Sequence, residues 1–299
     1  MKKREGHEHE SYKDELILDE FTDSDLRTWK RISELSEEYH IKLFYHLESL
    51  RNIHFDELKQ ALLASDLRNV EENNWFRYVD YKYSNEPLSS KGSIKEGKRF
   101  NIGDDLQSRG FRTFPAFYIA DSEETARQEK FGMPKVANGL EPHELALRDP
   151  GSFSAVRVKV SVENVFDLTK AKSLVKFTEI ISGFQLTHEL KKLAKELGMK
   201  PPYLVSKARQ LKSTLLENSW RYYPVQHNIP SNSQLFGRML NDIGIEAVLY
   251  PSVKHKSHKN LAIFSQNLEA SDSHIKIQDE PPSGVKFTSL DSKSWSELF

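Results

Sequence analysis

The sequence predicts an α+β fold, because helical and strand-like residue spacings occur in separate blocks along the chain. Apolar residues from Leu26 to Leu35 recur at three-residue steps, which is typical of an amphipathic helix. Residues 153–160 instead alternate apolar and polar side chains, which is typical of a half-buried strand. Helical spacing then returns in the second half of the chain, before two last short apolar strands.

The composition indicates a folded protein and excludes several kinds of chemistry. The chain has 299 residues, 37% of them apolar and 29% charged, so it can bury a core in one large or two modest domains. A formal net charge of -1 provides no general attraction to nucleic acid or to anionic membranes. The chain has no cysteine, which excludes disulfides, thiolate metal ligands and cysteine nucleophiles and suits a reducing cytoplasm.

The N-terminal sequence carries no targeting pattern. No apolar segment follows the charged residues 1–10, so we expect no signal peptide. No apolar run reaches the roughly 18 residues of a membrane span, so we expect a cytoplasmic protein with no membrane partner. We expect about the first 15 residues to be disordered. His7 and His9 lack a third ligand at helical spacing, so no metal site is predicted there.

Three helices are predicted between residues 24 and 66. They contain no recognisable catalytic residues, and they make residues 1–73 an N-terminal helical extension. This extension is a candidate lid, or an interface for a partner or for a second copy of the chain. Asn73 and Asn74 are expected to end it, and residues 75–79 form the first predicted strand. Arg77 lies inside this strand, where it needs a partner if buried or faces water if the strand is an edge.

The segment from Gly97 to Glu129 contains the main functional candidates. Two glycines flank Arg99 and Asn101 in a loop whose backbone can approach a ligand closely, so Arg99 is a candidate phosphate clamp. A buried strand with Tyr118 follows, and then a helix that begins at a capping-box-like pair, Asp121 and Glu124. Glu129 shares a flank of this helix with Ser122 and Ala126, so we expect its carboxylate to face inward.

The second half of the chain supplies further elements and one rigid hydroxyl. Helices are predicted at residues 188–197, 204–216 and 231–243, the last of which is capped by Ser231 or Ser233. Ser252 follows Pro251 at the end of a strand, where its hydroxyl can be held in one position. Asn260 begins the last core strand, and residues 271–299 are expected to form a polar, peripheral tail.

Taken together and in this order, these residues resemble the RES domain family. The family has an arginine-containing strand, a Gly-Arg-Trp-Asn-like loop, a tyrosine strand, a glutamate one short helix later, and a Pro-Ser pair followed by an asparagine. The matching residues here are Arg77, Gly97 to Asn101, Tyr118, Glu129, Pro251-Ser252 and Asn260, and Gln234 and Gly237 match a late helix. The resemblance covers residues 75–269. It departs from the pattern at Lys98, at Phe100 and in an extra polar stretch at residues 104–113.

The resemblance implies a fold and a division of the chain. The fold is an ADP-ribosyltransferase-like split, mainly antiparallel β core with flanking helices. Residues 74–270 are then the catalytic domain, preceded by the helical extension and followed by the tail at residues 271–299.

The resemblance also implies an activity, in which NAD is the substrate and no cofactor or metal is required. RES domains act as toxins that destroy NAD by cleaving its nicotinamide N-glycosidic bond with water or phosphate. They are usually neutralised by a helix-turn-helix antitoxin. Possible partners are therefore NAD, inorganic phosphate, a cognate antitoxin and a second copy of the chain, and no direct nucleic-acid binding is expected.

The residue roles follow from the charge that develops during the reaction. Departure of nicotinamide leaves positive charge on the ribose, which a nearby carboxylate stabilises, and Glu129 is the candidate. Arg99 is expected to hold the pyrophosphate, Tyr118 to contact the nicotinamide riboside, and Ser252 to orient the ribose or the attacking oxygen. The predicted substrate-binding residues are Arg77, Asn101 and Asn260.

Two other functions use the same sequence features. Transfer of ADP-ribose to a protein or nucleic acid requires the same residues, so the sequence does not separate it from hydrolysis. A non-catalytic interaction module with residues 24–66 as its working surface is the third hypothesis, and the altered Gly97–Gly103 loop is the feature that motivates it.

Overall fold

The computed structural model describes residues 23–132, 153–200, 202 and 204–299. The residues predicted to be disordered at the N-terminus lie outside this range. The described residues divide into two compact units. The first comprises the residues up to 43 together with residues 186–200, and the second comprises residues 44–185 and the remainder of the chain.

The first unit is helical. It contains the N-terminal part of α1 (Asp23–Ile53) and all of α7 (His188–Glu196). Tyr39 packs there with Leu190, Leu193 and Ala194 in a small apolar cluster. Helix α1 is continuous, so the first two predicted helices are a single helix.

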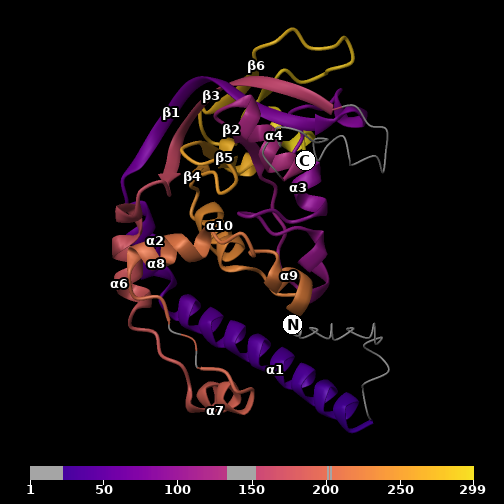
Figure 1. The fold of residues 1–299 in the computed structure, drawn as a ribbon. Coiled ribbons are helices and arrows are strands. Elements are labelled where there is room, and N and C mark those ends of the chain that lie inside the picture. Colours follow the sequence, from indigo (N-terminus) through magenta and orange to yellow (C-terminus); the bar gives the residue numbers. More distant parts are fainter. Residues whose placement is uncertain (1–22, 133–152, 201, 203) are drawn as a thin grey trace, which may run out of the picture. The chain divides into compact units, whose positions relative to one another are not determined.

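The second unit is built on a seven-stranded sheet in the order β1-β2-β5-β4-β3-β6-β7 (Figure 1). Strand β1 also pairs with β3, so five strands form a closed ring of pairings. Every pairing is antiparallel except that of β3 with β4. The predicted mixed fold with a mainly antiparallel core is therefore confirmed. The strands are β1 (Leu67–Asp80), β2 (Phe117–Ala120), β3 (Phe153–Asp167), β4 (Ala247–Pro251), β5 (Lys259–Ile263), β6 (His274–Ile277) and β7 (Ser289–Leu290).

Strands β1 and β3 are longer than their sequence patterns indicated. Strand β1 begins at Leu67, within the predicted helical extension, and continues through the Asn73-Asn74 pair. Asn74 has a φ of 64°, and the pairing with β3 shifts register between Glu72 and Trp75, so this pair forms a β-bulge rather than a break. The two strands predicted near residues 153–168 form the single strand β3.

Helices cover one face of the sheet. The larger apolar cluster contains buried residues of α2, α6, α8 and α10 together with Phe166, Val248 and Ala262 of the strands. Ser231, one of the two predicted caps, caps α10, and Gln234 completes a capping box. The helices of the second unit are α2 (Phe55–Leu63), α3 (Lys91–Lys95), α4 (Glu123–Phe131), α6 (Val175–Ile181), α8 (Ala208–Leu215), α9 (Tyr222–His227) and α10 (Asn232–Asp242), with 3₁₀ turns such as η3 (Asp104–Arg109) between them.

The C-terminal residues belong to the sheet, which differs from the predicted peripheral tail. Strand β6 pairs with residues 158–161 of β3, and β7 pairs with β6. Ile275 and Leu290 are fully buried in the second apolar cluster, on the other face of the sheet. These residues have low local hydrophobicity because only alternate side chains face the core.

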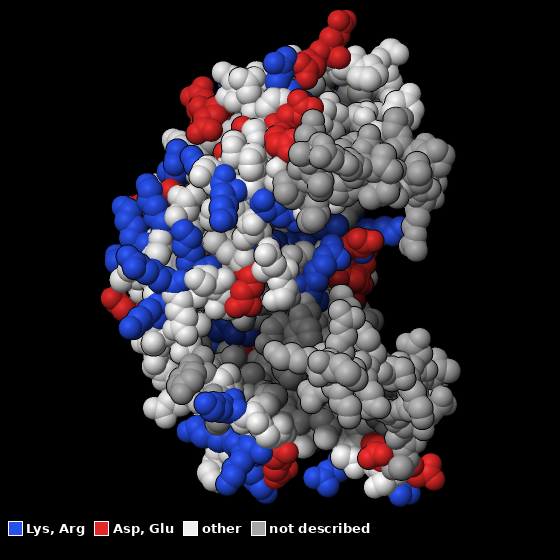
Figure 2. All heavy atoms as spheres, in the orientation of Figure 1, with Lys and Arg blue, Asp and Glu red and all other residues white. Residues whose placement is uncertain are grey.

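Charges are unevenly distributed over the surface. Figure 2 shows basic side chains gathered on the flank where Figure 1 draws β1, α6 and α8. Buried Asp167 lies within 3.8 Å of Arg68 and 3.6 Å of Lys170, which neutralises part of this patch. None of the described helices is long and apolar enough to cross a membrane.

Candidate active site

One face of the sheet presents three polar side chains that are close together. Tyr118 of β2 lies opposite Ala262 of β5, and Tyr250 of β4 lies opposite Asn260. Because directly paired residues point to the same side of a sheet, Tyr118, Tyr250 and Asn260 share one face. Asn260 is 3% exposed, so its amide is held within the protein.

Helix α4 brings Glu129 to this face. The helix is capped by Ser122, which accepts a hydrogen bond from the Thr125 backbone, whereas the predicted cap Asp121 instead binds His258 and the Lys259 backbone. Glu129 Oε1 accepts hydrogen bonds from Ser252 Oγ at 2.7 Å and from Asn260 Nδ2 at 2.8 Å. The structure therefore brings together three residues that the sequence predicted for the site.

The second carboxylate oxygen of Glu129 has no such close donor among the described residues. Among the described residues its nearest cation is Lys254, whose Nζ lies 3.9 Å from Oε2 and donates to the Glu129 carbonyl at 2.9 Å. The Glu129 side chain is 30% exposed, so it is only partly covered by the protein.

Ser252 is fixed by the loop that follows it. Its Oγ accepts a hydrogen bond from the His255 backbone at 3.0 Å while donating to Glu129. The His255 ring is hydrogen-bonded to Thr125 Oγ1 at 2.7 Å and stacks on His258 at 4.0 Å between ring centres. Helix α4 thus anchors the loop that positions the Ser252 hydroxyl.

The Gly97–Gly103 loop is held in shape by Asn101 and Tyr118. Tyr118 donates to Asn101 Oδ1 at 2.9 Å and accepts from the Phe100 backbone at 3.0 Å. Asn101 Nδ2 donates to the carbonyls of Ser93 and Phe114. Asn101 is completely buried with both ends of its amide used, so its contacts fix the loop and leave none for a substrate.

Helix α10 supports the same loop from behind. Gln234 Nε2 donates to the Asn101 carbonyl at 3.2 Å. A Cβ at Gly237 would lie 2.0 Å from the Phe100 carbonyl oxygen, so this position requires glycine. These contacts explain why Gln234 and Gly237 occur together in the late helix.

Arg99 extends from this loop toward the site. It is 9% exposed, and its Nη1 donates to the Glu217 carbonyl at 2.7 Å. Burial lowers the pKa of Arg99. Tyr250, Glu129 and Tyr118 raise it and so offset part of this shift. Its guanidinium is therefore a buried cation within electrostatic range of the Glu129 carboxylate.

Additional cations lie near this arginine in the sequence and in space. Burial and then Arg221 lower the pKa of Lys98, whereas Glu96, whose Oε2 lies 3.5 Å from Lys98 Nζ, acts against this shift. Mutual repulsion of this kind is relieved when an anion binds between the groups. Lys98 thus supplies a partly exposed cation next to Arg99 in the chain, and this cation is paired with Glu96.

Arg77 does not join the other predicted site residues. Phe76 pairs with Ala120, so Phe76 shares the face of Tyr118, and Arg77 points to the opposite face. There its guanidinium lies 4.5 Å from the Phe117 ring centre and donates to the Ser89 carbonyl at 2.9 Å. Alternation along β1 and β2 thus separates Arg77 from the face that carries Tyr118, and the substrate-binding role of Arg77 stays a prediction.

Sequence reasoning missed three contributors. Tyr250 is 6% exposed and lies near Arg99 and Glu129, and its hydroxyl makes no hydrogen bond to another described residue. It stands two residues before Ser252 and opposite Asn260, so the period of two in a strand was the available signal. Thr125 and His255 had no such signal, because 130 residues separate them. In the described ranges no cluster of His, Asp and Glu has the arrangement of a metal site.

Comparisons with known proteins place the chain in a family. No curated protein matches it in sequence. A chain from the crystal structure of the M. tuberculosis MbcT–MbcA toxin–antitoxin complex is similar, with 17% sequence identity and a TM-score of 0.42 over 81% of this chain and 96% of that chain. The sequence model of the RES domain matches residues 74–283, which is more than two thirds of the chain. The chain therefore belongs to the RES domain family.

Proposed function

We propose that the protein cleaves the nicotinamide N-glycosidic bond of NAD, by hydrolysis or phosphorolysis. The main support is the partly exposed Glu129 carboxylate, which Ser252 and Asn260 hold through one of its two oxygens. A carboxylate fixed before substrate arrives needs no reorganisation as positive charge develops on the ribose.

The reaction divides between the carboxylate and its neighbours. The bond between the ribose and nicotinamide breaks with its electron pair leaving on the nicotinamide nitrogen, and Glu129 stabilises the cation-like ribose. An oxygen of water or phosphate then bonds to the same carbon, and water releases its proton. Ser252, whose hydroxyl is fixed between His255 and Glu129, orients the ribose or this oxygen.

The cations at the site are suited to the pyrophosphate of NAD. Arg99 carries a permanent charge within electrostatic range of Glu129, and Lys98, which is paired with Glu96, is within range of Arg221 and Lys130. Tyr118 positions the Arg99 loop, and Tyr250 supplies, on the same face of the sheet, a hydroxyl that no other described residue binds. In this arrangement Asn260 and Asn101 act by positioning other groups.

The proposal extends to the wider setting of the family. We place the catalytic domain within the sheet-containing unit and assign it an ADP-ribosyltransferase-like fold, which the mainly antiparallel core supports. The family resemblance further supports a toxin that acts on cytoplasmic NAD and that a cognate antitoxin neutralises. NAD is then a substrate, and no cofactor is required.

The test is incubation of the full chain with NAD, with and without inorganic phosphate, followed by identification of the products. We expect free nicotinamide together with ADP-ribose or its 1″-phosphate. Glu129→Gln should reduce nicotinamide release by at least about 100-fold. Glu123→Gln, on the same helix but hydrogen-bonded to Tyr78, should not.

Product identity separates the alternatives. Label from NAD that appears on a protein or nucleic acid would instead identify ADP-ribosyl transfer. The proposal fails if nicotinamide is not released under either condition, or if Glu129→Gln is as active as the unaltered protein.

A further inference from the structure

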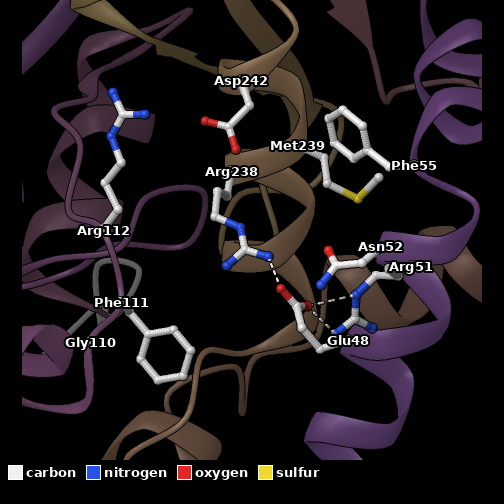
Figure 3. Close-up of a pocket in the computed structure, with 10 residues that line it drawn as sticks. All are labelled: Glu48, Arg51, Asn52, Phe55, Gly110, Phe111, Arg112, Arg238, Met239 and Asp242. Carbon is white, nitrogen blue, oxygen red and sulfur yellow. Dashed lines mark hydrogen bonds and ion pairs between the residues drawn. The ribbon is translucent and has the colours of Figure 1, made fainter.

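A pocket in the sheet-containing unit lies outside the residues of the candidate active site. It has a volume of about 350 Å³, which suits a small organic molecule. Figure 3 shows its walls, which come from the C-terminal part of α1, the start of α2, the segment after η3 and the outer side of α10.

The walls from α1 and α2 lie outside the matched RES domain. Their residues precede residue 74, where the match to the family begins. The other walls, from residues 110–112 and from α10, lie within the match. The pocket is therefore completed by residues beyond the family domain.

An ion cluster with excess positive charge forms one side of the pocket. Glu48 Oε2 accepts from Arg51 Nε and Nη2 at 3.1 and 2.8 Å, and Glu48 Oε1 accepts from Arg238 Nη2. The three side chains are 16–22% exposed. One carboxylate thus faces two guanidiniums, and among the described residues no hydrogen-bond acceptor meets Arg238 Nε or Nη1.

The opposite wall carries a third guanidinium. Figure 3 shows Arg112 across the pocket from Arg51, with Arg238 and Asp242 between them. Arg112 is exposed and forms no hydrogen bond or salt bridge with another described residue. Burial raises the pKa of Asp242, and Arg238 and Arg112 act against this rise. The pocket therefore holds three guanidiniums against two carboxylates.

Apolar side chains line the rest of the pocket. Phe55, Phe111 and Met239 provide flat and flexible apolar surface beside the charges. The Phe111 ring is fixed by an edge-on contact with Phe44, with ring centres 5.5 Å apart. A charged wall beside a rigid apolar one recognises molecules with both characters.

We propose that this pocket binds a small organic anion. Its carboxylate or phosphate group lies between Arg112 and Arg238, whose planar guanidiniums match either group. A flat apolar body packs against Phe55, Phe111 and Met239. The proposal is independent of the NAD-cleaving activity.

Fluorine NMR titration of the full chain tests this proposal with three probes that share one ring. We expect 4-fluorophenyl phosphate or 4-fluorobenzoate to bind at least about fivefold more tightly than neutral 4-fluorobenzyl alcohol. The tighter of the two anions identifies the preferred group. Equal binding of the alcohol and both anions would overturn the proposal.

Charge variants with opposite expected effects locate the bound probe. Arg112→Gln should weaken anion binding by about threefold, and Asp242→Asn should strengthen it by about threefold. Both residues are exposed, so both variants should fold, which melting curves verify. Arg109→Gln, an exposed control from the same segment, should leave binding unchanged. Identical binding by the Arg112 and Arg109 variants would contradict the proposal.

One further variant separates the pocket from the candidate active site, which also contains cations. Lys98→Gln should leave binding of the probe unchanged. Loss of binding in this variant, with none in Arg112→Gln, would place the anion at the active site and refute the pocket.

Discussion

Two tyrosines on the same face of the sheet differ in what their hydroxyls bind. The Tyr118 hydroxyl is fully engaged by Asn101 and the Phe100 backbone, so it serves the shape of the Arg99 loop. The Tyr250 hydroxyl is unengaged by other described residues. Burial raises the pKa of both phenols, so both stay protonated at neutral pH and Tyr250 can donate to a ligand.

Removal of each hydroxyl should therefore have a different result. Tyr250→Phe is expected to reduce nicotinamide release by at least about tenfold with little change in stability. Tyr118→Phe should lower the free energy of unfolding by about 1–3 kcal/mol, because Asn101 Oδ1 and the Phe100 N–H lose a buried partner. Turnover assays and urea unfolding check both. Full activity of Tyr250→Phe would remove that hydroxyl from the mechanism.

Arg77 is a buried cation without a carboxylate partner among the described residues. Burial lowers its pKa to about 10. Arg77→Met removes the charge and keeps the side-chain length, so the free energy of unfolding should stay the same or rise by about 1 kcal/mol. Nicotinamide release should stay within about twofold, since Arg77 points away from Tyr118. If the Arg77→Met protein folds but has no activity, Arg77 is required for the reaction.

At the scale of elements, α4 performs two tasks. Its last turn presents Glu129, and its first turn presents Thr125, which holds His255 in the loop after Ser252. The helix and the loop thus position the carboxylate and hydroxyl as a unit. Asp121, just before the helix, binds His258 at the other end of the loop.

Weakening this link should affect turnover more than substrate binding. Thr125→Val removes the hydroxyl with little change in volume, and we expect kcat to fall by about tenfold with KM nearly unchanged. Thr125→Ser retains the hydroxyl and should restore kcat. Steady-state kinetics of the three proteins test this, and equal kcat values for Val and Thr would show that the loop needs no anchor.

Acid should weaken α4 through Glu124. Hydrogen bonds from Arg127 and then Gln128 lower the pKa of Glu124 from 4.5 to about 2. Their stabilising effect is fully present above pH 4.5 and is lost as the pH falls toward 2. Glu124→Gln should make the melting temperature less dependent on pH in this window. An unchanged pH profile would mean that the unfolded chain keeps the same pKa.

At the scale of the whole molecule, distant segments complete the sheet. Strands β1 and β3 pair along most of their length, and β6 adds residues 274–277 to the free side of β3. The second apolar cluster therefore depends on residues near both ends of the sheet-containing unit.

A chain ending at residue 270 should consequently fail to fold. The missing residues 271–299 include the fully buried Ile275 and Leu290, and without β6 an edge of β3 is exposed. Leu290→Ala in the full chain should cost about 2–5 kcal/mol of unfolding free energy. Circular dichroism and thermal melting measure both effects, and a truncated chain that melts like the full one would show that β6 and β7 are dispensable.

Short sequence patterns predicted much of the fold, because helix caps and helix ends depend on interactions between residues that are close in the chain. Ser231 is the cap of α10, as one of the two predicted candidates, and Gly198 and Gly244 have the positive φ values of helix ends. The order of Arg99, Tyr118, Glu129, Ser252 and Asn260 was also enough to indicate the family. The sequence by itself thus determined the main elements and most of the candidate site.

Only the tertiary structure decided how those residues face one another. Strand pairing placed Arg77 on the far side of the sheet, turned Asn74 into a bulge and brought the C-terminal residues into the core. Packing gave Asn101 hydrogen bonds that hold the Gly97–Gly103 loop in shape. It also brought Arg51, Arg112 and Arg238 together around one pocket. These outcomes depend on contacts between residues far apart in the chain, which no short window of sequence contains.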